Sequence, residues 1–245
     1  MAENGQRVYV RTSSLLKQKI DSLLTKRELE ERHRPGRRVI HPSSISTCIR
    51  EIVLSILGYA VTEKIDGKSA RVFDAGKSMH ERYQKYLKEL GYADVEVFVR
   101  NEDLWLEGMI DAIVKINGER YIVELKSCNS YVFNSIQVPH RDYVEQVHAY
   151  MICTGIDKAI ILYENKDTQD IKEFVIEKDQ SIIDKIVEKC KEIQSYVERK
   201  EIPPMTCKTK SDARYCVYKG YCFNDKTTVK SKGVTVVSQE GTDTI

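Results

Sequence analysis

No stretch of this chain is apolar for long enough to span a membrane, and its first residues show no secretory signal pattern. An excess of charge of one sign is also missing, because the formal net charge at pH 7 is only +2 over 245 residues. Any affinity for nucleic acid must therefore come from local basic patches. The sequence contains no internal repeat. We expect a cytoplasmic protein with no membrane partner.

The cysteines argue against a disulfide framework. There are seven, an odd number without a secretory signal, which indicates a reducing compartment. Cys128, Cys153 and Cys190 lie within or beside expected regular elements and are interpreted as small core residues. The other four are Cys48, Cys207, Cys216 and Cys222. Four thiolates suit either zinc or a [4Fe-4S] cluster, and free thiols are the third alternative.

The order of expected elements predicts an α/β fold. Hydrophobic content of 41% with 31% charged residues is ordinary for a globular protein. Periodicity and stop signals predict helices over 12–33, from about 43 to 57, and over 70–90, 139–153 and 180–199. Strands are expected over 95–100, 105–116, 121–127, 158–164 and 171–177. We therefore expect a layered domain, built in the order helix, three-strand meander, helix, two strands and helix.

Four regions follow from this order. They are an N-terminal helical region over 1–69 that contributes Cys48, a core over 70–200, a cysteine-rich module over 201–225, and a flexible tail over 226–245.

Asn117-Gly118 between two apolar runs is a strong signal for a two-residue hairpin turn. Such a turn sets the register, so that Asp111 lies opposite Glu124, with Lys126 on the same face. The opposite face is then a core face. Its residues are Ile110, Ala112, Val114 and Ile116 on one strand, and Tyr121, Val123 and Leu125 on the other.

Two carboxylates held about 5 Å apart at Cβ resist joint ionisation. A divalent cation between Asp111 and Glu124 would remove this cost, and Mg²⁺ and Mn²⁺ prefer such oxygen ligands. Lys126 could then orient a water molecule or stabilise charge on a phosphoryl group. The alternative is a surface strand pair in which Glu124 merely pairs with Lys126.

These residues resemble the PD-(D/E)XK nuclease superfamily. The sequence motifs around them resemble its RecB-type exonuclease branch. Gly108-Met-Ile-Asp111 is similar to the G-x-x-D strand, and Val123-Glu-Leu-Lys-Ser127 to the E-x-K strand. Gln146-Val-His-Ala-Tyr150 is similar to the Q-x-x-x-Y helix, and Gly76-Lys-Ser-Met-His80 to the helix whose histidine joins the metal site. The resemblance covers roughly residues 40–225 and implies a restriction-endonuclease-like core.

The resemblance also implies residue roles. His80, Asp111, Glu124 and the Leu125 carbonyl hold Mn²⁺ or Mg²⁺, and Lys126, Gln146 and Tyr150 complete the catalytic set. Without the resemblance, His80 is a half-buried helix residue. Gln146 and Tyr150, four residues apart, then form the polar edge of a packed helix.

One upstream cysteine with three near the C-terminus resembles the iron–sulfur RecB-type nucleases, among them the CRISPR-associated and AddB-like ones. The resemblance implies a [4Fe-4S] cluster on Cys48, Cys207, Cys216 and Cys222 that joins distant parts of the chain. The five residues between Cys216 and Cys222 fit the family. The eight between Cys207 and Cys216 exceed the usual two, which is compatible with a looser phage-type variant. Zinc and free thiols stay open as alternatives.

We therefore expect a metal-dependent DNA exonuclease that hydrolyses phosphodiester bonds, on single-stranded ends, in a bacterium or phage-infected host. Partners in recombination, replication or CRISPR adaptation are implied. The alternatives are a structure-specific endonuclease on the same fold, and a non-catalytic nucleic-acid-binding recombination module.

Overall fold

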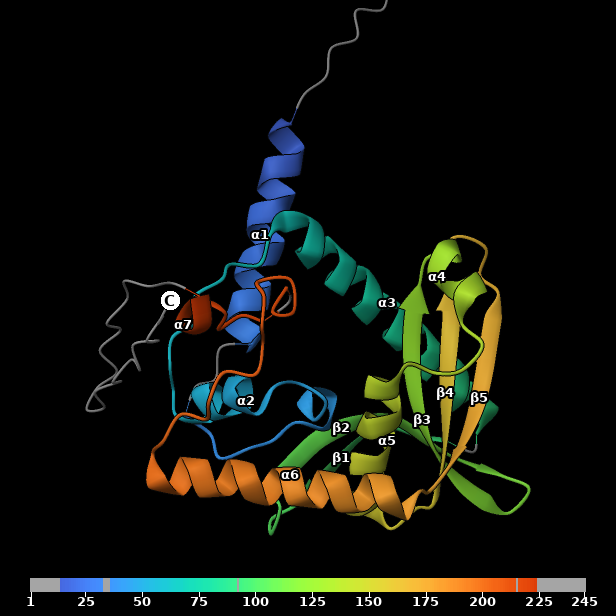
Figure 1. Ribbon diagram of the computed structural model, residues 1–245. Coiled ribbons are helices and arrows are strands. Elements are labelled where there is room, and N and C mark those ends of the chain that lie inside the picture. The colour runs from blue at the N-terminus through green and yellow to red at the C-terminus, as the bar shows by residue number, and fades with distance from the viewer. Residues whose placement is uncertain (1–13, 33–35, 92, 215, 224–245) are drawn as a thin grey trace, which may run out of the picture. The chain divides into compact units, whose positions relative to one another are not determined.

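The computed structural model describes residues 14–32, 36–91, 93–214 and 216–223 of the chain (Figure 1). The tail expected over 226–245 lies outside these residues. The described residues form two compact units, one containing residues 14–32 with 65–75, and the other containing the described residues of 36–64 and 76–223. Within the described ranges, no helix combines the length and apolarity that crossing a membrane requires.

The first unit contains helix α1 (Leu15–Arg32) and the beginning of helix α3 (Gly67–Leu90). Asp21 on α1 forms ion pairs with Lys17 and with Arg71 of α3. Helix α3 begins where the Asp66 carboxylate accepts hydrogen bonds from the Lys68 and Ser69 amides, as an N-cap residue does. It ends at Gly91, the predicted stop, with φ of 77°. Both helices confirm the sequence prediction.

The second unit is built on one five-stranded sheet in the order β1-β2-β3-β4-β5. The strands are β1 (Ala93–Asn101), β2 (Leu106–Ile116), β3 (Glu119–Cys128), β4 (Lys158–Asn165) and β5 (Ile171–Glu177). Neighbours are antiparallel except β3 and β4, which run parallel. The predicted α/β fold, with its meander of three strands followed by two more, is therefore confirmed.

The Asn117-Gly118 turn has the predicted register. Both residues have positive φ, 51° and 87°, and the ladder pairs Ile116 with Glu119 and continues to Ala112 with Val123. Ile116 shares a face with Val114 and Ala112, as predicted, but it is not part of the core. Its side chain is 38% exposed, because it lies beside the turn and outside the cluster that buries Ala112 and Val114.

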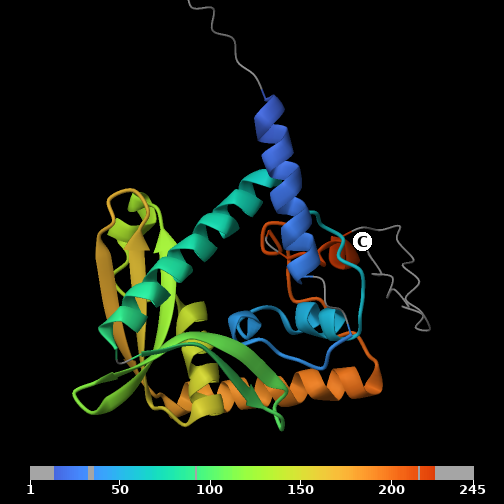
Figure 2. The ribbon, with the colours of Figure 1, turned by 180° about the vertical axis from the view of Figure 1, so that it is seen from behind.

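Helices cover both faces of the sheet (Figures 1 and 2). Helix α5 (Arg141–Thr154) packs Val147, Tyr150 and Met151 against Ile110, Ile113 and Ile122. On the other face, Met79 and Tyr83 of α3 pack against Ala112, Val114, Val123 and Leu125. The hairpin is thus buried on both faces, where the sequence analysis had assigned it only one core face. Ile110 lies on the α5 face, so its predicted place beside Ala112 and Val114 was wrong.

A third apolar cluster forms beside the sheet, around helix α6 (Gln180–Arg199). It includes residues of helix α2 (Ile49–Ile56), together with Ile40 and Ile45, which flank the 3₁₀ helix η1 (Pro42–Ser44). Helix α4 (Ser130–Ser135) follows β3 and was not predicted. The Asn129 side chain begins it by accepting a hydrogen bond from the Val132 amide.

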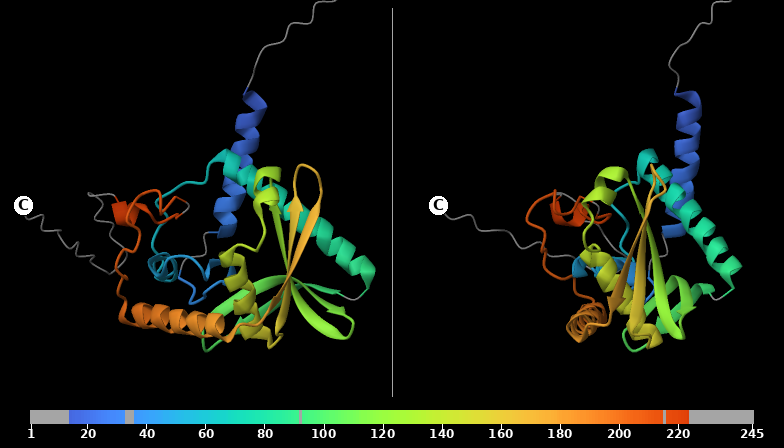
Figure 3. Two further views of the ribbon diagram at one scale, coloured as in Figure 1. Left: turned by 45° about the vertical axis from the view of Figure 1, so that its right-hand side comes forward. Right: turned by 90° about the vertical axis from the view of Figure 1, so that its right-hand side faces the viewer.

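Strands β2 and β3 part beyond the Ala112–Val123 pair (Figure 3). From that point β2 continues its ladder with β1, and β3 continues its ladder with β4. We call the opening between residues 106–111 of β2 and 124–128 of β3 the fork. Its position matters because Asp111 and Glu124 are the first residues on its two arms.

Gly108 on the β2 arm allows close packing. A Cβ atom there would lie 2.9 Å from Pro42 Cδ and 3.2 Å from Tyr150 Cε1. We expect Gly108→Ala to lower the free energy of unfolding by about 1–3 kcal/mol, through overpacking. Urea unfolding followed by circular dichroism measures this.

Gly76→Ala is the matched control, because a Cβ at Gly76 in helix α3 meets nothing within 4 Å. Alanine should raise helix stability there by about 0.5–1 kcal/mol. Equal effects of the two substitutions would contradict the packing described for Gly108.

Candidate active site

Asp111 lies where the β2–β3 ladder ends, and its carboxylate replaces the missing strand partner. Oδ2 accepts a hydrogen bond of 2.8 Å from the Leu125 amide on β3. Oδ1 lies 2.9 Å from Nδ1 of His80, which α3 brings to the same point. Nearby, the β1–β2 ladder pairs Val95 with Ala112 and Val97 with Ile110 but skips the pair between them.

The skipped residue on β1 is Glu96, which has a positive φ of 52°. A left-handed conformation costs a non-glycine residue roughly 1–2 kcal/mol. Such strain is typical of functional sites, and here it lies on the strand beside Asp111.

Glu124 is a buried carboxylate, with 3% of its surface exposed. Its Oε1 accepts hydrogen bonds from Lys126 Nζ at 2.6 Å and from Gln146 Nε2 at 2.9 Å. The predicted neighbourhood of Glu124 and Lys126 on one face is therefore present, and α5 adds Gln146 to it.

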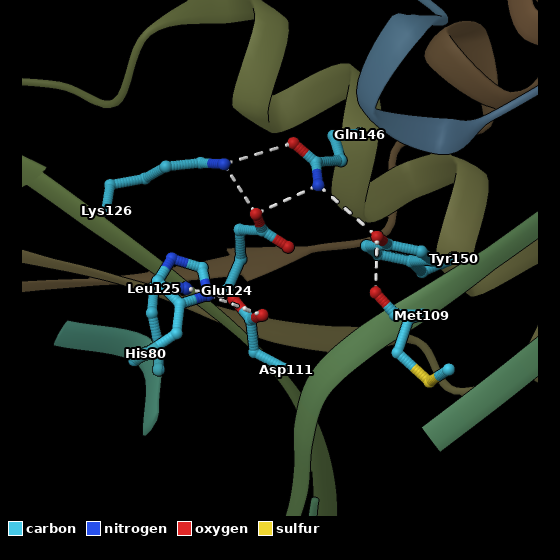
Figure 4. A network of polar contacts seen from close by, with 8 residues as sticks. All are labelled: His80, Met109, Asp111, Glu124, Leu125, Lys126, Gln146 and Tyr150. Atoms are coloured by element: carbon cyan, nitrogen blue, oxygen red, sulfur yellow. Dashed lines mark hydrogen bonds and ion pairs between the residues drawn. The ribbon is translucent and has the colours of Figure 1, made fainter. Parts of the chain in front are cut away.

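Helix α5 connects the two arms of the fork (Figure 4). The Tyr150 hydroxyl donates to the Met109 carbonyl on β2 at 2.9 Å and accepts from Gln146 Nε2 at 3.3 Å. The same Gln146 amide group binds Glu124 on β3. The predicted common face of Gln146 and Tyr150 is thus observed, and its partners on the strands are now defined.

Lys126 has contacts on three sides. Besides Glu124, its Nζ lies 3.4 Å from Gln146 Oε1 and 4.4 Å from the centre of the Tyr143 ring. An ammonium group over a tyrosine ring gains a favourable cation–π interaction. The side chain is thereby held at the fork with its charge directed toward the carboxylates.

Burial strongly disfavours the charge of Glu124. It raises the pKa of Glu124 to about 7, and the charge of Asp111 acts in the same direction. Burial also acts on Lys126 and His80, where by itself it would lower the pKa. At Lys126 the charge of Glu124 and its hydrogen bond together outweigh burial, and at His80 the hydrogen bond with Asp111 and the charges of Asp111 and Glu124 together do so. Both pKa values are therefore raised.

The donors at the fork suit a hard divalent cation in kind: two carboxylates and one imidazole. Within the described ranges, however, no three His, Cys, Asp or Glu side chains are placed to hold a metal ion. The side chains at the fork instead bind one another and their neighbours. Asp111 binds His80 and the Leu125 amide, while Glu124 binds Lys126 and Gln146. Ionised Glu124 is costly here, as its pKa of about 7 shows, and a bound cation would offset that cost.

Two features of the site were not part of the sequence expectation. Leu125 was assigned through its carbonyl, and the structure shows in addition that its amide donates to Asp111. The Met109 carbonyl was not anticipated as the partner of Tyr150. No sequence signal points to a main-chain carbonyl, because its availability depends on where the ladder ends.

His148, which the sequence analysis left out of the site, is buried elsewhere. Its Nδ1 donates to the Val144 carbonyl, and its Nε2 accepts from the Asp179 amide at the beginning of α6. This histidine therefore joins α5 to α6.

The C-terminal cysteine-rich segment packs on residues that follow Cys48. Tyr218 is buried with Leu54 and Tyr59, and the Arg50 guanidinium donates to the carbonyls of Pro203 and Tyr221. The short helix α7 (Gly220–Phe223), which contains Cys222, ends the described chain.

The four candidate thiols lie in this region. Burial, and then the charges of Cys48 and Cys222, raise the pKa of Cys207. Burial, and then Glu51, raise the pKa of Cys216 to about 12, and Cys222 also acts on it. Cys207 is thus affected by Cys48 and Cys222, and Cys216 by Cys222. Among the described residues, none of these thiols belongs to a group placed to hold a metal.

Cys190 and Cys153 behave as the sequence analysis predicted for core residues. Cys190 is fully buried, and Cys153 packs against two of the apolar clusters. Burial raises the pKa of both thiols, to about 12 and about 11. Cys128 is half-buried at the end of β3 and packs against the cluster under α5.

No protein-family model and no curated protein matches the sequence. Solved structures do match. The crystal structure of SSO0001 covers 85% of this chain and 98% of its own, with a TM-score of 0.57 and 20% identity. LHK-Exo, an alkaline exonuclease from Laribacter hongkongensis, covers 70% of this chain and 93% of its own, with a TM-score of 0.52 and 16% identity. A structure of LHK-Exo in complex with dAMP gives a TM-score of 0.50. The chain shares their fold.

Metal-free protein should lose stability, relative to a Glu124→Gln variant, as the pH rises from about 4.5 to about 7. The folded-state pKa of Glu124, about 7, lies above the ordinary value of 4.5, so proton uptake favours the folded state. This stabilisation is complete below pH 4.5 and is gone above pH 7. Urea unfolding of both proteins in a chelating buffer, at pH values spanning this window, measures the difference.

Glu119→Gln is the control on the same strand. The hydrogen bond from Lys158 lowers the pKa of the exposed Glu119, so its contribution is lost on acidification instead. Wild type should therefore show no loss relative to Glu119→Gln over the same window. A flat difference between wild type and Glu124→Gln would contradict the buried, proton-binding Glu124.

Proposed function

We propose that this protein is a metal-dependent nuclease that hydrolyses phosphodiester bonds of DNA, acting as an exonuclease on single-stranded ends. The observation that carries the proposal is the fork itself, where Asp111, Glu124 and Lys126 meet His80 and Gln146. The fold shared with LHK-Exo, described as an alkaline exonuclease, supports it.

His80, Asp111, Glu124 and the Leu125 carbonyl would hold Mn²⁺ or Mg²⁺. When bound, the metal supplies an activated water molecule and a positive charge at the scissile phosphate. The cost of ionising buried Glu124 supports this assignment, because a cation bound by Glu124 and Asp111 would offset it. His80 contributes a nitrogen ligand, and its contact with Asp111 holds both side chains in place.

Lys126 acts on the phosphate and the water. Its ammonium group keeps its proton beside Glu124, so it can donate hydrogen bonds and stabilise negative charge that develops on the phosphate oxygens. The Tyr143 ring and Gln146 hold this group in position.

Gln146 and Tyr150 have different roles in this proposal. The Gln146 amide lies against Glu124 and Lys126, within reach of a bound phosphate or water. Tyr150 is only 3% exposed, and its hydroxyl is already bound to Met109 and Gln146. Tyr150 is therefore a positioning residue that acts through Gln146 and the β2 arm.

Asp111→Ala and Glu124→Ala should reduce cleavage at least about a hundredfold, since each removes a metal ligand. The assay is a time course on linear single-stranded DNA with Mn²⁺, labelled separately at the 5′ and 3′ ends. Glu119→Gln, a surface change on the same strand as Glu124, should cleave like wild type.

Three outcomes decide among the candidate functions. Label released first from one end supports an exonuclease and gives its polarity, whereas defined internal fragments indicate an endonuclease. Binding without cleavage by wild type indicates a non-catalytic module. Near-normal cleavage by folded Asp111→Ala or Glu124→Ala would overturn the assigned site.

We further propose that Cys48, Cys207, Cys216 and Cys222 bind a [4Fe-4S] cluster, with zinc as the alternative. Support comes from the packing of the C-terminal segment on residues 50–62, and from the effects of Cys48 on the pKa values of Cys207 and Cys222 and of Cys222 on that of Cys216. Four thiolates are the usual ligands of such a cluster. Bound there, it would join the two ends of a long loop.

Protein purified without oxygen should be brown and contain iron. Cys48→Ala and Cys222→Ala should lose the iron, because each removes a ligand. Cys128→Ala, which changes a thiol at the end of β3, should keep it. Elemental analysis and the visible absorption spectrum measure both. Colourless protein with stoichiometric zinc, or with no metal, would reject the cluster.

A further inference from the structure

A cavity of about 440 Å³ lies between helices α5 and α6 and the turn that follows η1. It lies on a different face of α5 from the fork. Glu145 lines the cavity, while its neighbour Gln146 points into the fork, and successive residues of a helix point about 100° apart. The two sites are thus adjacent, but they share no residue.

The cavity has an apolar floor and a charged rim. Ile45, Val144, Ile182 and Ile186 supply the apolar surface. Its size falls within the range that holds small organic ligands, roughly 300–1,000 Å³.

The carboxylates of the rim already have partners on or beside α5. Glu145 accepts from Arg141 at 2.6 Å, and Asp142 lies 3.4 Å from His140. In the structure these contacts keep both carboxylates on or beside α5, and neither lies within 4.0 Å of a lysine of α6.

Two lysines of α6, Lys185 and Lys189, face the same cavity. Among the described residues, neither forms an ion pair with a carboxylate within 4.0 Å. Lys189 Nζ donates only to the Thr47 carbonyl, at 2.7 Å. Burial lowers the pKa of Lys189, although Glu145 acts in the opposite direction.

We propose that this cavity binds one nucleotide unit, with its phosphate on Lys185 and Lys189 and its sugar or base on the apolar floor. Two lysines four residues apart on one helix, both lining the cavity, suit a phosphate, whose oxygens accept several charge-assisted hydrogen bonds. The inference rests on the proposed nuclease function and extends it, because a second contact beside the fork would hold the strand while the fork acts on it. The nucleotide comes either from the bound strand or from a released mononucleotide.

Lysine acylation of the full-length protein tests the proposal at the residues concerned. The protein is treated with an acylating reagent without added divalent metal, alone or with a short single-stranded oligonucleotide, a nucleoside 5′-monophosphate, or the nucleoside. Mass spectrometry then compares Lys185 and Lys189 with Lys191, an exposed lysine of the same helix outside the cavity.

Lys185 and Lys189 should be modified several-fold more slowly with a phosphate-bearing ligand, while Lys191 and the nucleoside control stay unchanged. Protection by the oligonucleotide alone supports a strand site, and protection by the mononucleotide as well supports a site that also admits the product. Equal protection of all three lysines, or of none, overturns the proposal.

Binding of the oligonucleotide provides the second measurement. Lys185→Gln should weaken it several-fold at low salt and reduce the slope of log K against log salt by about 0.7, as expected for one lost phosphate contact on a single strand. Lys191→Gln should change neither value, and equal behaviour of the two variants would also overturn the proposal. Lysine protection in a wild type that never cleaves DNA would reject the nuclease function and keep this site. Cleavage without lysine protection would keep the nuclease function and reject this site.

Discussion

The parting of β2 and β3 after the Ala112–Val123 pair is the constraint on which the candidate site depends. A continuous ladder would satisfy the main-chain groups of both strands and leave no room for side chains between them. Because the strands separate, the Leu125 amide and the Met109 carbonyl need other partners. Asp111 binds the first and Tyr150 binds the second. The residues that repair the ladder are therefore the residues that line the site.

Helix α5 stabilises this open arrangement from one face of the sheet. Its apolar residues pack on β2, β3 and β4, while Gln146 and Tyr150 contact the two arms of the fork. Gly108 allows η1 and Tyr150 to approach the β2 arm closely. The polar network therefore rests on a packed core, which keeps its geometry preorganised.

The charges at the fork give the site its chemical character. A buried carboxylate beside a second one is costly, and here Lys126 offsets only part of that cost, since the pKa of Glu124 is still raised to about 7. Such a group binds a proton or a cation readily. Lys185 and Lys189, on a neighbouring helix, present the opposite imbalance, with positive charge that lacks a carboxylate partner in the described part of the chain. The negative charge at the fork is complementary to a metal ion, and the positive charge of Lys185 and Lys189 is complementary to a phosphate.

Local features of the sequence by themselves determined most of the elements and the hairpin register. Asn117-Gly118 sets the register because a two-residue turn admits few geometries, and apolar periodicity located α6 from Gln180 to Arg199. Likewise, Gln146 and Tyr150 share a face because four residues make slightly more than one helical turn. Only the tertiary structure decided where the β2–β3 ladder ends, that both faces of the hairpin are buried, and that Met109 and the Leu125 amide take part in the site. These features depend on the pairing of β2 with β1 and of β3 with β4, and on the packing of α5 against these strands. Such contacts join distant parts of the sequence, so no local pattern predicts them.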